Sequence, residues 1–175
     1  MAAKSVRTKL VTNKVRLSFV NVFEPAETLN GVLKYSTMVL IPKSDKEGVA
    51  RFNKAFEDTK QANAAFFGGS VPKLLKGGLR DGDAEKEDPE FVGHYFFNAY
   101  ANIDRKPGVV DAEVNPILDK NEVYSGCYGR VSIDLFPYDT AGARGIAVGL
   151  NNVQKLEDGE RLGGASTSAA TDFAA

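Results

Sequence analysis

The chain has 175 residues, of which 43% are hydrophobic and 26% charged, a composition typical of one soluble globular domain. No apolar run approaches the roughly 20 residues of a membrane helix, and the N-terminus lacks the apolar segment of a signal peptide, so neither a membrane protein nor an exported one is expected. The single cysteine, Cys127, excludes an internal disulfide. A formal net charge of −1 excludes the strongly basic composition of a chromatin protein.

The first half of the chain predicts two strands followed by a helix. Residues 14–23 alternate, which places Val15, Leu17 and Phe19 inward, and a second strand at 33–41 is stopped by Pro42. Ser44 and Glu47 have the spacing of a capping box, which predicts a helix within about 44–68 that ends at a glycine pair. A short second helix is expected at 70–78.

The second half predicts further strands and one hairpin. Residues 93–104 alternate, with aromatic and polar side chains on the outward face, and a turn at 106–108 leads into Val109 and Val110. Residues 125–137 place Cys127, Val131, Ile133 and Leu135 on a core face. The residues 145–153 return as the hairpin partner of this strand.

Several short strands with one long helix between them favour a mainly β fold. We expect an antiparallel Greek-key barrel similar to the oligonucleotide-binding fold, with the inserted helix at about 44–68. A β-sandwich is the main alternative. Residues 1–162 are expected to form one nucleic-acid-binding domain, and residues 163–175, which are small, polar and without periodicity, to form a flexible, disordered tail.

The sequence gives no support to catalysis, a cofactor or a metal site. His94 is the only histidine, so a zinc site would have too few ligands and a catalytic triad would depend on this one residue. Residues 81–90 are acidic but fail the calcium-loop pattern at Lys86 and Val92. A two-metal nuclease would need Asp104, Asp111 and Asp134 to converge. The chain is therefore not expected to be an enzyme.

Three segments together resemble one known family. They are Tyr100–Asp111, Tyr124–Arg130 and Gly145–Gln154, and their order and spacing are similar to those of the bacteriophage single-stranded DNA-binding proteins formerly described as a domain of unknown function. The resemblance runs from about Val6 to Gly164. It implies an oligonucleotide-binding fold, binding without catalysis in phage DNA replication or recombination, and a location in the cytoplasm of the infected bacterial host.

The charge distribution and the outward-facing residues define the candidate contacts. Residues 1–20 hold five basic residues and no acid, and outside residues 81–90 the chain has 21 basic and 17 acidic residues, a net of +4. Tyrosines would stack on bases, cations would neutralise phosphates, and asparagines would bond base edges or sugars. The candidates are Lys14, Arg16, Lys34, Asn98, Tyr100, Asn102, Arg105, Lys106, Tyr124, Tyr128 and Arg130.

Single-stranded DNA is thus the expected partner, bound with little sequence preference. Phage or host replication proteins would bind through the tail, whose end holds Asp172 and Phe173. The alternative is a non-enzymatic virion or assembly protein with a β-sandwich fold, in which the aromatic face would be a protein interface.

Overall fold

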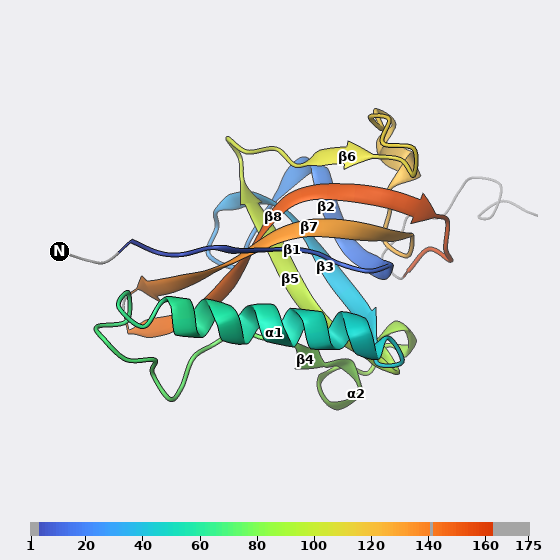
Figure 1. Ribbon diagram of the computed structural model, residues 1–175. Coiled ribbons are helices and arrows are strands. Elements are labelled where there is room, and N and C mark those ends of the chain that lie inside the picture. The colour runs from blue at the N-terminus through green and yellow to red at the C-terminus, as the bar shows by residue number, and fades with distance from the viewer. Residues whose placement is uncertain (1–3, 141, 163–175) are drawn as a thin grey trace, which may run out of the picture.

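The computed structural model describes residues 4–140 and 142–162, and the predicted C-terminal tail lies outside these residues. Figure 1 shows a strongly curved sheet with one long helix along its side. In chain order the elements are β1 (Thr8–Val11), β2 (Val15–Glu27), β3 (Leu33–Pro42), α1 (Lys46–Ala62), β4 (Arg80–Asp81), α2 (Gly82–Glu85), η1 (Pro89–Phe91), β5 (His94–Asn102), β6 (Gly108–Val110), η2 (Lys120–Glu122), β7 (Tyr128–Thr140) and β8 (Ala143–Glu157).

The central strands close into a barrel. β7 pairs with β2, β2 with β3, β3 with β5, β5 with β8, and β8 pairs back with β7. All of these pairings are antiparallel except that of β5 with β8, where Tyr100 lies opposite Gly149. The remaining strands β1, β4 and β6 extend the sheet from β7, β5 and β8. The prediction of a mainly β barrel with an inserted helix is confirmed, and this closure is typical of an oligonucleotide-binding fold.

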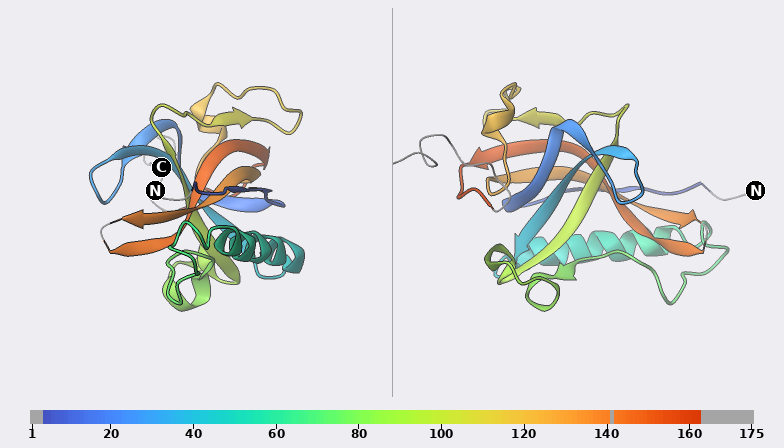
Figure 2. Two further views of the ribbon diagram at one scale, coloured as in Figure 1. Left: turned by 60° about the vertical axis from the view of Figure 1, so that its left-hand side comes forward. Right: turned by 180° about the vertical axis from the view of Figure 1, so that it is seen from behind.

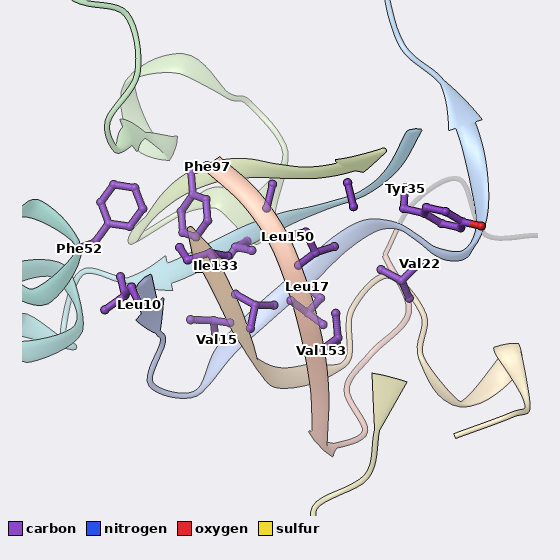
Figure 3. Packing of buried hydrophobic residues seen from close by; sticks show 14 of the residues in the cluster. Leu10, Val15, Leu17, Val22, Tyr35, Phe52, Phe97, Ile133, Leu150 and Val153 are labelled. Atoms are coloured by element: carbon purple, nitrogen blue, oxygen red, sulfur yellow. The ribbon is translucent and has the colours of Figure 1, made fainter. Parts of the chain in front are cut away.

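The barrel interior and the inner side of α1 form one hydrophobic core. Figure 3 shows side chains from β2, β7 and β8 meeting inside the barrel, with Phe52 of α1 beside Phe97 of β5. The ring centroids of these two residues are 4.7 Å apart, and Phe52 is 1% exposed. The predicted core face of β7 is confirmed, because Cys127, Val131 and Ile133 are buried, as is Leu135.

The helix begins at a different residue from the one predicted. Asp45, not Ser44, is the N-cap, and its carboxylate accepts a hydrogen bond of 3.0 Å from the backbone amide of Gly48. The helix ends at Ala62 in a run of turns, short of the predicted glycine pair. Residues 70–78 form no helix, because Lys76 instead exchanges backbone hydrogen bonds with the β7–β8 hairpin.

A bulge in β2 overturns one predicted core position. The pairing shifts between Ser18, opposite Met38, and Asn21, opposite Ser36, so β2 has one residue more than β3 in this interval. Such a bulge breaks the alternation of side chains. Phe19 is therefore 61% exposed with a positive φ of 47°, whereas the outward-predicted Ser18 is buried.

Candidate nucleic-acid interface

One half of the outer face of β3 and β5 is covered by the chain itself. Met38 and Leu40 of β3 and Phe96 of β5 point away from the barrel, yet all are buried with Phe91 in a second small hydrophobic cluster. The rings of Phe91 and Phe96 meet edge to face at 5.4 Å. The segment 80–91, which contains the whole acidic stretch 81–90, therefore acts as a lid over this half of the face.

The other half of the same face is open and hollowed. Backbone pairing sets Lys34 opposite Asn102 and Ser36 opposite Tyr100, beyond the reach of the covering segment. A groove of about 560 Å³, here called the β5 groove, runs over this half and onto β8 and β7. Its lining consists of Arg7, Lys34, Tyr100, Ala101, Asn102, Asp104, Arg105, Lys106, Phe136 and residues 147–151.

The floor of the β5 groove has an aromatic residue on each side of a glycine. Tyr100 is 41% exposed and lies opposite Gly149 on the adjacent strand. A Cβ at Gly149 would lie 3.3 Å from the ring of Phe136, so the absence of a side chain there leaves both rings accessible from the groove. Flat aromatic surfaces with open space above them suit stacking by the bases of a single strand.

Basic side chains surround these rings. Lys34, Arg105 and Lys106 line the groove, and within residues 4–140 and 142–162 none of the three forms an ion pair with an acid. Arg7 stacks over the Phe136 ring at 4.4 Å and has Asp134 at 3.7 Å. The groove therefore offers cations suited to phosphates beside rings suited to bases.

Several residues that line this groove were not among the predicted contacts, and two of them, Arg7 and Phe136, have side chains suited to nucleic acid. Phe136 lies on the outward-facing positions of the strand at 125–137, so alternation alone gave a signal for it. Arg7 gave no such signal, because its position over Phe136 depends on the pairing of β1 with β7.

The predicted tyrosines do not share one surface, which corrects the expectation of a single aromatic face. Tyr128 pairs with Arg16 and Glu157 at the start of β7, whereas Tyr100 lies opposite Gly149. Glu157 and Gly149 are eight residues apart on β8, which corresponds to about 27 Å along a strand. Lys14, Arg16, Tyr124 and Tyr128 thus form a separate cluster at the far end of the barrel.

This second cluster is largely occupied by the chain's own residues 158–162, here called the C-terminal strap. The Tyr124 hydroxyl donates to Asp158 at 3.0 Å and accepts from the Gly159 amide at 3.1 Å, and the Arg161 guanidinium lies 4.1 Å from the Tyr124 ring centroid. Arg16 donates to the backbone carbonyl of Glu160 at 2.8 Å. Because these contacts fix the strap in place, they favour a structural role for Tyr124 and Arg16.

Tyr128 and Lys14 are held in the same cluster. The ring of Tyr128 is half-buried, with the Lys14 ammonium 5.2 Å and the Arg16 guanidinium 5.4 Å from its centroid. Lys14 also pairs with Glu157. Tyr128 was predicted to be accessible on the outward face, and its ring is only partly exposed because the strap lies beside it at Gly159.

The last two candidate contacts, Arg130 and Asn98, lie outside both the β5 groove and the second cluster. Arg130 is exposed as predicted, and its guanidinium donates to the Thr12 carbonyl at 3.0 Å beside a small apolar pocket that includes Val114. Asn98 is partly exposed opposite Met38, at the boundary between the covered and open halves of the face.

Two of the three aspartates considered for metal chemistry have other contacts, and Asp104 lines the β5 groove. Asp111 accepts the backbone amides of Glu113 and Asn115 at 2.9 Å each, and these bonds hold the pKa of its carboxyl below its ordinary value. Asp134 faces Arg7. Within the described residues, no three histidine, cysteine or acidic side chains gather as a metal site would require, and no helix there is long and apolar enough to cross a membrane.

Comparisons with known proteins agree with this fold. Residues 8–175 match the family model described as "Enterobacter phage Enc34, ssDNA-binding protein". Protein p50 of Acyrthosiphon pisum secondary endosymbiont phage 1 is 28% identical over 173 residues, which cover 94% of this chain and 92% of that protein.

Solved structures of other phage proteins are similar in fold. The single-stranded DNA-binding protein from bacteriophage Enc34 in complex with ssDNA has a TM-score of 0.73 and 22% identity, with 89% of each chain covered. The single-stranded DNA-binding protein gp2.5 of bacteriophage T7 has a TM-score of 0.61 and 17% identity, with 96% of this chain and 95% of that chain covered. With its family model spanning nearly the whole sequence, this chain belongs to the family of the Enterobacter phage Enc34 ssDNA-binding protein.

Proposed function

We propose that this protein binds single-stranded DNA with little sequence preference, during DNA replication or recombination of a phage. The observation that carries the proposal is the β5 groove, an open channel on the barrel surface in which Tyr100 and Phe136 lie among Arg7, Lys34 and Lys106. Membership of the Enc34 family, and the ssDNA held by the solved Enc34 relative, support the same ligand.

The binding mechanism follows from the two kinds of side chain in the groove. Bases stack on Tyr100 and Phe136, and each base–aromatic stack contributes about 1 to 3 kcal/mol. The cations neutralise phosphates and release counterions, so that affinity falls as salt rises. Asn102, exposed beside Tyr100, bonds base edges or sugar oxygens. Because every base has a flat face and every nucleotide a phosphate, this mechanism tolerates any sequence.

The protein acts in this proposal as a binding protein and not as an enzyme, in the cytoplasm of the infected bacterium. The description of the family supports this view. Among the described residues Asp104 is the single acid that lines the groove, and the nearby Asp134 faces Arg7, so no pair of acids is placed for catalysis there. Partners in replication would be recruited by the C-terminal tail, residues 163–175. The alternative of a virion β-sandwich protein is not favoured, because the chain folds as a closed barrel.

Titration with unlabelled oligo-dT tests the proposal. The parent protein should bind in a salt-dependent manner and prefer the single strand to a duplex of equal length. Tyr100→Ala should weaken binding by about 5- to 150-fold, the equivalent of one lost stack, whereas Tyr100→Phe, the matched control, should retain most of it. A parent protein that does not bind oligo-dT at low salt would refute the proposal.

A further inference from the structure

The exposed Phe19 lies in β2 between Ser18 and Asn21, whose partners on β3 belong to the outer face that carries the β5 groove. Its neighbours in β2 fix its position: Ser18 is opposite Met38, and Asn21 is opposite Ser36, which is in turn opposite Tyr100. Phe19 therefore lies two strands from Tyr100, a separation of about 10 Å at the usual strand spacing. The right view of Figure 2 shows β2, β3 and β5 side by side, on the far side of the barrel from the view of Figure 1.

Phe19 is kept out of the core at an evident cost. Regular alternation after Val15 and Leu17 would bury its ring, but the bulge gives it a left-handed backbone with φ 47° and leaves it 61% exposed. A bulky residue with positive φ is a conformational outlier, and exposed phenylalanine loses its burial free energy. Bulges beside binding sites re-aim side chains in this way.

The surface between Phe19 and Tyr100 is formed by the small polar side chains of Asn21 and Ser36. The Asn21 amide donates to the Phe19 carbonyl at 3.2 Å and to the Ser36 hydroxyl at 3.5 Å, so the polar groups of these two side chains are bonded to each other and to the backbone. Neither Asn21 nor Ser36 is bulky enough to block a chain passing from the groove toward β2. Lys34, two residues from Ser36, supplies a cation beside this path.

We infer that Phe19 is a further stacking platform, on which a base lies after the single strand leaves the β5 groove across β3. This inference rests on the proposed function and adds to it a second binding position on β2. Phe136, Tyr100 and Phe19 then follow one another across the sheet, and the bound strand runs across the β-strands rather than along them.

A tryptophan at position 19 provides a direct test, because the chain contains no tryptophan. In Phe19→Trp, oligo-dT should quench the new fluorescence in parallel with binding, since a stacked base contacts the indole. In the matched control Leu74→Trp, whose parent residue is 91% exposed and outside the groove, the emission should not change. Binding without quenching at position 19 would overturn the inference.

Affinity measurements separate this inference from the proposed function. Phe19→Ala should lower oligo-dT affinity about 5- to 150-fold and leave the salt slope unchanged, with no loss of stability in urea because the ring is exposed and its backbone strained. If Tyr100→Ala weakens binding and a folded Phe19→Ala does not, the inference fails and the proposed function stands. If the parent and the two variants all fail to bind oligo-dT, both the inference and the proposed function are refuted.

Discussion

Replacing Arg105 and Lys106 together with alanine should make DNA binding less sensitive to salt. Both side chains are exposed in the loop after β5 and line the β5 groove, and neither has an acidic partner in the ion pairs of the described chain. Each should therefore neutralise one phosphate. For single strands each phosphate contributes about 0.7 to the slope of log affinity against log salt, so the double variant should be flatter by about 1.4.

This change in slope is large enough to measure. Between 50 and 200 mM salt, the parent should lose about sevenfold more affinity than the double variant. The measurement is a fluorescence-anisotropy titration of labelled oligo-dT at four or more salt concentrations. Folding should be unaffected, because the backbone amide of Arg105 that bonds the Asn102 carbonyl at 2.9 Å is retained.

Two control variants make the result decisive. Lys73→Ala removes an exposed cation outside the groove and should leave the slope unchanged. Tyr100→Ala should lower affinity at every salt concentration without changing the slope, because stacking releases few counterions. A double variant with the parent's slope would show that Arg105 and Lys106 do not contact phosphates, and the groove would lose its electrostatic basis.

Three further predictions concern the folded domain. Phe52→Ala should lower the free energy of unfolding by about 3 to 5 kcal/mol in urea titrations, because the ring is fully buried against Phe97. Hydrogen bonds from Lys43 lower the pKa of Asp81 and of Asp83. The contribution of these two aspartates to stability is therefore present above the ordinary aspartate pKa of about 4 and is lost as the pH falls below it. Lys43→Met should flatten this acid dependence of the free energy of unfolding, measured by urea titrations between pH 2 and 7. Burial raises the pKa of the Cys127 thiol, so a thiol reagent should modify it slowly until the protein unfolds.

Each of these predictions has a clear opposing outcome. A Phe52→Ala variant as stable as the parent would mean that α1 does not seal the core. An unchanged acid profile in Lys43→Met would mean that its bonds to the two aspartates contribute nothing in solution. Equal thiol reactivity in native and denatured protein would reverse the assignment of the core face of β7.

Local pattern was sufficient for the class of fold and for the core face of β7. Alternation identified the buried Val131, Ile133 and Leu135, because a strand with one face in a barrel must place apolar residues at every second position. Helical spacing of apolar residues located α1, because a helix that packs on the core must have one apolar side. The cap was misassigned by one residue, since Ser44 and Asp45 are both good N-caps and only the backbone path selects one.

The shape of the binding surface was decided by the tertiary structure. Phe19 lies outside the core because β2 has one extra residue where it pairs with β3. The sequence of β2 alone does not show the register of this pairing. The lid of residues 80–91 closed half of an otherwise uniform outer face, and the strap covered Tyr124 from 34 residues away along the chain. The sequence determined which residues suit nucleic acid, by their chemistry and outward position. Which of them share one groove depends on contacts between distant segments, and these exist only once the barrel has closed.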